Sequence, residues 1–281
     1  MWIDRTALCM AWMSAVSSLH AQSVLIAPTA IVIEAARPSA AITLVNTGTA
    51  PAEVVLSFAF GLPATDSTGN MYLKLDESPA DTLPSAADFM HAYPARLVLP
   101  AGGRQVVRLV AAPRRSLAVR EYWARLVVTS RQGRPLTAFT SSAAGIATEA
   151  QVALDLEVRS VLAVFYRPAG LSTALEIGVP SVRIANGQLE SRARLSRVGN
   201  AAFVGSIAAV LRDSLGTIRS RKSLPLGVYN DIEPLIAFPL GTLPRGTYEL
   251  EFSAHAERPD VPSASLLPAR VTSRKVTVTV P

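Results

Sequence analysis

The chain has 281 residues, of which 49% are hydrophobic and 17% charged, a composition that argues for packed domains and against disorder over most of its length. Its 27 Lys and Arg residues against 21 Asp and Glu give a net charge of +6, but the basic residues are scattered along the sequence. That distribution excludes the clustered basic surface of a nucleic-acid-binding protein. The length favours two domains.

The first 21 residues have the organisation of a secretory signal peptide. Arg5 supplies a positive charge, residues 6–19 are uncharged and mostly apolar, and Ala21 offers a small residue at the cleavage site. The apolar stretch is too short to span a bilayer, although an N-terminal membrane anchor is the alternative. We therefore predict export, cleavage after Ala21 and no stable membrane insertion. The single cysteine, Cys9, lies inside this segment, so the mature chain would have no disulfide and no cysteine metal site.

Short β-branched runs separated by Gly, Pro, Asn or Asp predict strands throughout the first half of the chain. The strands expected before residue 130 are 23–26, 31–34, 40–46, 52–60, 95–99, 104–111 and 120–129. Residues 61–93 are predicted to be mostly a long surface loop, with one short strand at 71–75. Residues 130–149 are predicted to form a second long loop, and loops of this length are either functional or poorly ordered.

The stretch from Gln151 to Tyr166 has the most informative strand pattern in the chain. Its apolar residues alternate with polar ones, which gives the strand one apolar and one wet face. The apolar positions are Val152, Leu154, Leu156 and Val158. Pro168 cannot donate to a strand ladder, and together with Gly170 it marks a bend. This bend predicts a boundary between a first domain, 22–167, and a second domain, 168–281.

The second half repeats the same style of short strands. They are expected at 182–185, 189–198, 202–211, 217–224, 235–238, 247–254 and 270–280. Asp213 to Gly216 is predicted to be a hairpin turn between two of them. Seven strands in about 110 residues is typical of an immunoglobulin-like sandwich. The predicted fold class is therefore all-β, with two immunoglobulin-like β-sandwich domains in tandem after a cleavable signal peptide.

The sequence carries no recognisable catalytic or metal-binding pattern. His91 and His255 are the histidines that remain after signal removal, and neither has a partner at the spacing of a metal site or a catalytic triad. No glycine-rich phosphate loop is present. The acidic pairs are explained as a polar loop, at Asp76-Glu77, and as the solvated face of a strand, at Glu249 and Glu251. We therefore predict a protein that is not an enzyme and uses no cofactor.

The long alternating strand has two structural interpretations. It can lie at the edge of a domain, where its free side pairs with another chain. It can equally be an ordinary central strand of a sandwich, because alternation does not distinguish an edge from a centre. A partner-binding role therefore requires residues 152–158 to be unpaired on one side.

Several segments, in order along the chain, resemble the periplasmic pilus-assembly chaperones of the PapD-like family. Phe165-Tyr166-Arg167-Pro168 resembles the end of their first domain, and residues 42–46 resemble their second main strand, which ends in Asn. The stretch YPARLVLPAGGRQVVRL, from Tyr93 to Leu109, resembles their succession of Pro, apolar strand, turn and Val-Arg. Arg120-Glu121-Tyr122-Trp123 resembles their Arg-Glu-aromatic segment. The resemblance covers residues 24–171, and the second half is similar only as another sandwich.

The resemblance implies a mechanism for the alternating strand. Members of the family lend the last strand of their first domain to a pilin subunit that lacks its own final strand. The lent residues implied by position are Val152, Leu154, Leu156 and Val158. The family also keeps an inter-domain ion pair, which here falls on Glu121 and Arg167. The alternative is that Arg167 is solvated at the bend.

The sequence departs from the family at a second feature. Family members bind the terminal carboxylate of the subunit with two basic residues in the cleft between the domains. Those positions fall here on Ala30 and Ala163, neither of which can bind an anion. Arg159 or another Arg of the first domain is a candidate substitute, and the sequence does not identify which.

The prediction is an exported, periplasmic, non-enzymatic chaperone that caps pilus- or fimbria-like subunits by lending an edge β-strand. Its expected partners are pilin-like subunits, with an outer-membrane usher as a further candidate. The alternative is a structural or interaction module of an extracellular assembly, made of immunoglobulin-like domains that never capture a subunit. The loss of both basic anchor positions favours this alternative. A carbohydrate- or ligand-binding sandwich comes last, because no motif supports it.

Overall fold

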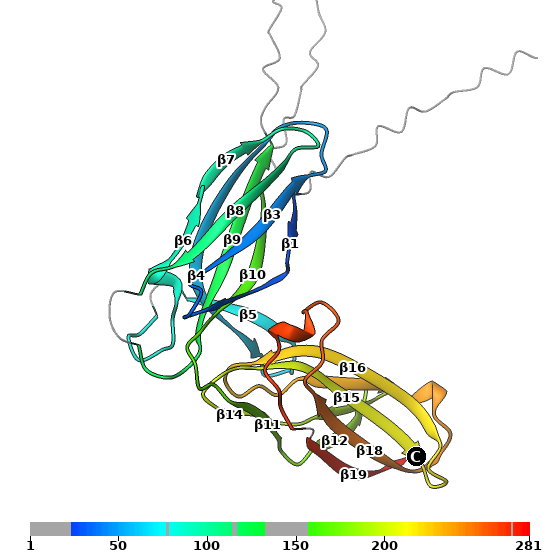
Figure 1. Cartoon of the computed structure of the whole chain (residues 1–281). Helices are drawn as coiled ribbons and strands as arrows, with labels where there is room; N and C mark the ends of the chain where they lie inside the picture. The colour runs from blue at the N-terminus through cyan, green and yellow to red at the C-terminus, as the bar shows by residue number, and fades with distance from the viewer. Residues whose placement is uncertain (1–23, 77–78, 114–116, 133–156, 271) are drawn as a thin grey trace, which may run out of the picture.

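The computed structural model describes residues 24–76, 79–113, 117–132, 157–270 and 272–281. Over these residues the chain is all-β and forms two immunoglobulin-like β-sandwich domains in tandem, as the sequence predicts (Figure 1). Helical structure in the described ranges is limited to three short 3₁₀ helices, η1 (Ala87–Phe89), η2 (Leu240–Thr242) and η3 (Ser263–Ser265). The predicted signal peptide and three of the predicted strand positions, Val152, Leu154 and Leu156, lie outside the described residues.

The first domain packs two sheets around one hydrophobic core. One sheet has the order β1-β3-β8-β6, with strands β1 (Val24–Ala27), β3 (Ser39–Asn46), β8 (Arg104–Ala111) and β6 (Met90–Tyr93). The other has the order β2-β10-β9-β4-β5, with β7 paired to β4. Its strands are β2 (Ala30–Glu34), β10 (Glu157–Arg167), β9 (Tyr122–Gln132), β4 (Ala52–Thr65), β5 (Met71–Asp76) and β7 (Arg96–Leu99). Alternate residues of each sheet face inward, so that Leu44, Leu109 and Leu126 are fully buried.

The long loop predicted over residues 61–93 is wrong at both ends, where strands lie, whereas the short strand predicted within it at 71–75 is confirmed as β5. Strand β4 continues to Thr65, β5 returns beside it, and β6 closes the segment. Pro63 is tolerated in β4 because β9 pairs with this strand only as far as Ala59, so that β5 is its single neighbour beyond that point. The segment is therefore a hairpin that extends the sheet, and the local richness in Pro, Gly and Asp marks its turn.

The second domain is built from three groups of paired strands around a second core. The largest has the order β16-β15-β18-β19, with β16 (Ile218–Val228), β15 (Phe203–Asp213), β18 (Gly246–His255) and β19 (Thr272–Val280). A three-stranded sheet contains β12 (Ser181–Ala185), β13 (Gln188–Arg192) and β17 (Leu235–Pro239). The third is the pair of β11 (Thr173–Ile177) and β14 (Leu195–Gly199).

Two predictions for the second domain need correction. The single strand expected at 189–198 is two strands, because the chain leaves the β12-β13-β17 sheet at Arg192 and pairs with β11 from Leu195. Leu189, Ala193 and Leu195 are all buried, so the apolar alternation continues through the change of partner and hides it. Strand β11 was not predicted at all. The turn predicted at Asp213 to Gly216 is confirmed, since Asp213 Oδ1 accepts hydrogen bonds from the backbone at both Leu215 and Thr217.

The two domains are joined by packing rather than by strand pairing in the described residues. A third apolar cluster contains Trp123 and Phe165 from the first domain and Val204 and Tyr229 from the second. All pairs of described strands lie on one side or the other of residues 168–172. The division between residues 167 and 168 itself stays a prediction.

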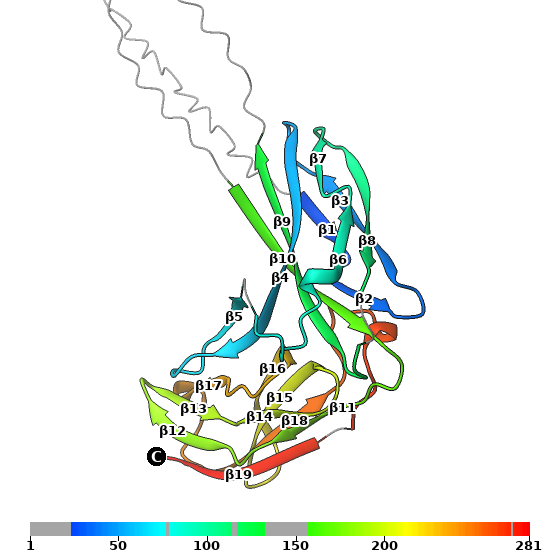
Figure 2. The same cartoon turned by 90° about the vertical axis from the view of Figure 1, so that its left-hand side faces the viewer.

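The β4–β5 hairpin makes a further contact between the domains. Figure 2 shows this hairpin extending from the first domain to the second beside β13 and β17. At its tip, the Leu235 amide donates to the Gly69 carbonyl at 2.9 Å, and Arg192 Nη1 donates to the Ser67 carbonyl at 2.9 Å. Met71 packs against the core of the second domain. The second domain is thus held at the linker and, separately, at the hairpin.

Candidate partner-binding edge and inter-domain cleft

Strand β10 is paired unequally on its two sides. On one side β9 pairs with it antiparallel along residues 157–166. On the other side β2 pairs with it in parallel, but only from Ala163 to Arg167, because β2 begins at Ala30. Among the described residues, 157–162 therefore have a neighbouring strand on one side only. A partner-binding role requires residues 152–158 to be unpaired on one side, and residues 157 and 158, the described part of that segment, meet this requirement.

The two faces of β10 have different surroundings. Leu162, Val164 and Tyr166 point into the first core, and Val158 shares their phase and is half-buried. On the opposite face, Glu157 accepts hydrogen bonds from Arg131 Nε and Arg159 Nε, each at 2.6 Å. These two bonds, that from Arg131 first, hold the pKa of the Glu157 carboxyl below its ordinary value. The alternation in the sequence thus corresponds to a core face and a charged outer face.

The predicted set of strand residues is described only at its end. Val158 is the one member within the described residues, and it pairs in register with Ser130 of β9. Val152, Leu154 and Leu156 lie outside them. The phase of the sequence places all four on the face of Leu162 if the strand is continued toward its N-terminus.

The structure brings Glu121 and Arg167 together at the junction between the domains. Arg167 Nε donates to Glu121 Oε1 at 2.6 Å, and the side chains are 10% and 0% exposed. Glu121 Oε2 accepts from Trp123 Nε1 at 2.7 Å and from the Ala202 amide of the second domain at 2.9 Å. Arg167 Nη1 donates to the Ser265 carbonyl at 2.7 Å. The pair therefore contacts both domains and is not a solvated charge at the bend.

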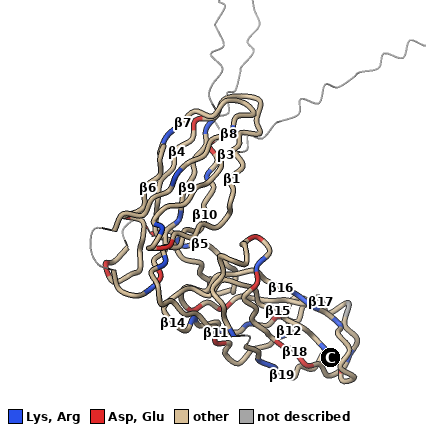
Figure 3. Tube along the Cα trace, in the orientation of Figure 1, with Lys and Arg blue, Asp and Glu red and all other residues tan. Residues whose placement is uncertain are grey.

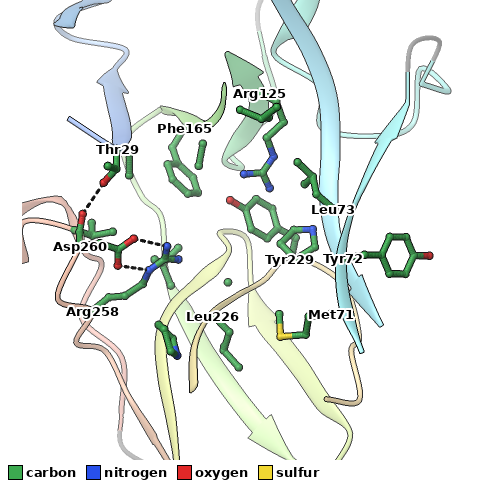
Figure 4. A pocket seen from close by; sticks show the side chains of 18 residues that line it. Thr29, Met71, Tyr72, Leu73, Arg125, Phe165, Leu226, Tyr229, Arg258 and Asp260 are labelled. Carbon is green, nitrogen blue, oxygen red and sulfur yellow. Dashed lines mark hydrogen bonds and ion pairs between the residues drawn. The ribbon is translucent and has the colours of Figure 1, made fainter. Parts of the chain in front are cut away.

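A cleft of about 500 Å³ lies between the domains, on the outer face of β10. Ala30 and Ala163, the positions without a basic residue, are register partners on β2 and β10, and both line the cleft. Ala163 is also the register partner of Arg125 on β9, so the three residues form one row across the sheet. Figure 4 shows Arg125 and Tyr229 pointing toward each other between Phe165 and Leu73.

Arg125 and Tyr229 are cleft residues that the sequence did not single out. The guanidinium carbon of Arg125 lies 5.1 Å from the centre of the Tyr229 ring, in a cation–π contact. The Tyr229 ring stacks on Phe165 and meets Trp123 edge to face. Burial raises the pKa of the Tyr229 hydroxyl above its ordinary value. No local pattern could identify these residues, because they meet only through the packing of two domains.

The residues considered for catalysis lie apart from one another. His91 is exposed on β6, and His255 ends β18 with Nε2 2.9 Å from Ser253 Oγ. Glu249 pairs with Lys275 on the neighbouring strand. Among the described residues, no three His, Cys, Asp or Glu side chains are grouped to hold a metal ion. Within the same residues, no helix has the length and apolarity to cross a membrane.

The charged residues of the described chain are dispersed. Figure 3 shows Lys and Arg distributed over both domains and interleaved with Asp and Glu. Many of them form exposed ion pairs, such as Arg37 with Glu34 and Arg194 with Asp231. Pairs of this kind contribute little to stability. The net charge of +6 is accordingly not gathered into one surface of the part that the structure describes.

Comparison of sequences finds no match, either to a protein-family model or to a curated protein. Comparison of structures finds matches to several chaperones. The crystal structure of the YadV chaperone aligns with 16% identity and a TM-score of 0.49, covering 90% of this chain and 99% of that one. A chain of the CsuC–CsuE chaperone–tip adhesion subunit pre-assembly complex, from archaic chaperone-usher Csu pili of Acinetobacter baumannii, aligns with 16% identity and a TM-score of 0.46, covering 89% and 97%.

The periplasmic chaperone SfaE aligns with 10% identity and a TM-score of 0.42, covering 92% of this chain and all of the other. The structures of YadV, CsuC–CsuE and SfaE thus match this chain over 89–92% of its length at 10–16% identity.

Proposed function

We propose that this chain is a periplasmic chaperone that caps pilus- or fimbria-like subunits by lending the edge of β10 as a strand. The observation that carries the proposal is the one-sided pairing of residues 157–162, which leaves backbone groups available to a partner chain. A subunit that lacks a strand has an unpaired sheet edge of its own, which can form hydrogen bonds with the free edge of β10. Such a chaperone needs neither a cofactor nor a catalytic residue.

The backbone of β10 shows which groups face the free side. The Arg167 carbonyl accepts a hydrogen bond from the Ala35 amide, just beyond β2, so Arg167 directs its backbone groups toward the β2 side. Backbone groups alternate sides along a strand, and the register with β9 is continuous from Glu157 to Tyr166. Arg159 and Val161 therefore direct their backbone groups to the same side, where β2 is absent. These two residues would pair with the subunit.

The side chains of the lent strand supply the apolar part of the interaction. Val158 lies on the core face of β10, and by phase Val152, Leu154 and Leu156 belong with it. Each fully buried aliphatic side chain contributes roughly 1.5–3 kcal/mol. The ordering of both chains on binding offsets a large part of that gain. We propose that these four residues fill the groove of the subunit.

Glu121 and Arg167 would set the angle between the domains. Their contacts with Ala202 and Ser265 of the second domain support this role. A fixed angle would hold the second domain beside the cleft while a subunit occupies the free edge. The pair would therefore position the binding surface without contacting the subunit.

Backbone and side-chain variants of β10 test the proposal. Val161→Pro removes a backbone N–H on the free side, while Val161→Ala keeps that N–H and removes part of the same side chain. Each mature variant is co-expressed in the periplasm with a pilin-like subunit, which is then purified by its tag. We expect capture to be lost with Val161→Pro and with the double change of Leu154 and Leu156 to Asp, but kept with Val161→Ala. Capture that survives both changes would refute the lent-strand mechanism.

Export is a separate part of the proposal. We propose that the signal peptide ends at Ala21 and that the mature chain begins at Gln22. Mass spectrometry of protein isolated from the periplasmic fraction should find this N-terminus. Protein that stays in the membrane fraction with residues 1–21 attached would support the anchor alternative. An outer-membrane usher, as the acceptor of the capped subunit, is a further proposed partner.

The alternative function is a structural or interaction module of an extracellular assembly. It is favoured by Ala30 and Ala163, which leave the adjoining positions of β2 and β10 without a cation. In that case the chain would remain in the assembled fibre. A chaperone is released when its subunit is assembled, so immunoblotting of purified fibres distinguishes the two functions.

A further inference from the structure

We infer that Asn200 is a positioning residue for subunit capture, because its side chain fixes the linker between the domains and thereby the orientation of the second domain to the free edge of β10. The inference deepens the proposed function and rests on it for the part that orientation has in capture. The fixing of the linker rests on hydrogen bonds at the junction alone. Asn200 lies in the connection between β14 and β15.

The side-chain amide of Asn200 joins segments from different parts of the chain. Its Nδ2 donates to the Val119 carbonyl at 2.9 Å and to the Gly170 carbonyl at 3.2 Å. Its Oδ1 accepts a hydrogen bond from the Ser172 amide at 2.8 Å. An asparagine amide offers two N–H donors and one carbonyl oxygen, so both donors and the acceptor are used. Two carbonyl partners and one N–H partner also leave only this orientation of the amide group.

These three partners lie in two places. Val119 precedes β9 and belongs to the first domain, whereas Gly170 and Ser172 belong to the linker between β10 and β11. Asn200 itself belongs to the second domain. One side chain of the second domain is thus hydrogen-bonded both to the first domain and to the segment that connects the two.

The backbone of Asn200 is held at the same point. Its amide donates to the Ser172 carbonyl at 3.1 Å, and its carbonyl accepts from the Glu121 amide at 2.9 Å. The second bond joins Asn200 to the residue whose carboxylate binds Arg167. The two contacts between the domains are therefore neighbours, but they use different atoms and can be tested separately.

Gly199 allows the linker to come this close to Asn200. Its φ is +94°, and a Cβ atom at this position would lie 2.4 Å from the Ser172 carbonyl oxygen. A side chain here would push the linker away from the connection between β14 and β15, in addition to straining the backbone. Glycine thus admits the linker, and the following asparagine binds it.

The position of the contact makes Asn200 a determinant of orientation. Gly170, three residues beyond the end of β10, has a φ of +81°. A glycine adopts many backbone conformations, and the hydrogen bond from Asn200 to its carbonyl selects one of them. No strand pairing joins the domains in the described residues, so the conformation of the linker directs the second domain relative to β10. The Glu121–Arg167 pair and the β4–β5 hairpin hold other points. Loss of Asn200 should therefore widen the range of orientations without separating the domains.

The first test measures orientation in the full mature chain, without a subunit. Distances between spin labels on the two domains are measured by electron paramagnetic resonance. Asn200→Ala removes all three side-chain hydrogen bonds, and Asn200→Asp has nearly the same shape but keeps only the acceptor for Ser172. We expect both variants to widen the distance distribution. The control Asn230→Ala, which replaces an exposed asparagine, should leave it unchanged. An unchanged distribution in Asn200→Ala or in Asn200→Asp overturns the inference.

A second pair of variants displaces the linker while Asn200 stays in place. Gly199→Ala introduces the contact with Ser172, and we expect it to change the distance distribution as well. Gly216→Ala is the matched control, because Gly216 has a φ of +79° but a Cβ atom there would have no neighbour within 4 Å. This control should lower the melting temperature through backbone strain and keep the distribution of the wild type. Equal distributions in Gly199→Ala and Gly216→Ala overturn the role of the contact, and this comparison also decides if Asn200→Ala does not fold.

The last measurement connects orientation to capture. The readout is the amount of mature chain that co-purifies from the periplasm with a tagged pilin-like subunit. We expect Asn200→Ala to reduce this amount about threefold or more, and Gly216→Ala to reduce it less. A widened distribution with undiminished capture overturns the part of Asn200 in capture and leaves strand lending intact. Absence of capture by the wild type overturns the proposed function, whereas the distance distributions still decide whether Asn200 fixes the linker.

Discussion

Arg167 donates a 2.6 Å hydrogen bond to Glu121, and the same carboxylate accepts a hydrogen bond from the backbone amide of Ala202 in the second domain. Replacing Glu121 with Ala leaves Arg167 buried without its ionic partner. We expect this change to lower the free energy of unfolding by about 3–5 kcal/mol. Urea denaturation followed by far-UV circular dichroism measures the loss.

The matched control is Glu53→Ala. Glu53 lies 3.9 Å from Arg96, and both side chains are exposed, so its removal should change the free energy of unfolding by less than about 1 kcal/mol. Equal losses for the two variants would show that the Glu121–Arg167 pair contributes no more than a surface contact.

Removal of the Arg192 side chain should loosen the contact between the β4–β5 hairpin and the second domain. Arg192 lies in the second domain and donates hydrogen bonds to the carbonyls of Ser67 and Thr68 in the turn of the hairpin. In Arg192→Ala we expect a wider distribution of inter-domain distances, measured by electron paramagnetic resonance between spin labels on the two domains. The control Lys275→Ala removes an exposed ion pair with Glu249 within the second domain and should leave the distribution unchanged. An unchanged distribution in both variants would contradict a role for the hairpin in holding the domains together.

The turn of that hairpin should be sensitive to acid. Hydrogen bonds from the Thr68 side chain and the Asn70 backbone lower the pKa of Asp66 from 3.8 to about 2. Because the folded state favours the ionised form, this contribution to stability is complete above the unfolded pKa and is lost as the pH falls toward 2. NMR titration of the Asp66 carboxyl carbon should give the low value, and Thr68→Val should raise it. A wild-type pKa near 3.8 would contradict the hydrogen-bonded turn.

Gly205 should not tolerate a side chain. A Cβ atom there would lie 2.2 Å from the carbonyl oxygen of His255 and 2.9 Å from the Phe203 ring, so β15 and β18 would have to separate. We expect Gly205→Ala to lower the free energy of unfolding by about 1–3 kcal/mol or more. Gly241→Ala is the control, since a Cβ atom at that position would have no neighbour within 4 Å and its effect should be within about 0.5 kcal/mol. The two variants are compared by thermal denaturation. A decrease in melting temperature of equal size in Gly205→Ala and Gly241→Ala would contradict the crowding at Gly205.

The fold class was predictable because it depends on local pattern. β-Branched runs with period-two alternation locate most strands to within a few residues, and strand β8 has the predicted limits. The strand break between Arg192 and Leu195 was not predictable, since burial of Leu189, Ala193 and Leu195 keeps one phase through it. The extension of β4 over residues 61–65 was missed because Pro63 indicates a strand breaker unless the loss of β9 as a neighbour is known.

The candidate site was predictable only in part. The alternation of residues 152–158 indicates a strand, but its free side depends on where β2 begins, which is a property of the sheet. The meeting of Glu121 and Arg167 was expected from the family resemblance and not from spacing. Arg125 has no distinguishing sequence context. Arg125 is recognised as a cleft residue only by its contacts with Gly61 and Tyr229, which are remote in the chain and reach it only in the folded protein.

Strand β4 has a mechanical consequence. Its 14 residues span roughly 45 Å at about 3.3 Å per residue. One end is hydrogen-bonded to β9 and β7 in the first domain, and the other continues into the turn held by Arg192 and Leu235. Strand β4 therefore forms a rigid connection between the two domains. Any bending between them must strain the ladder from β4 through β9 to β10, so a force on the second domain is transmitted to the strand that carries the free edge.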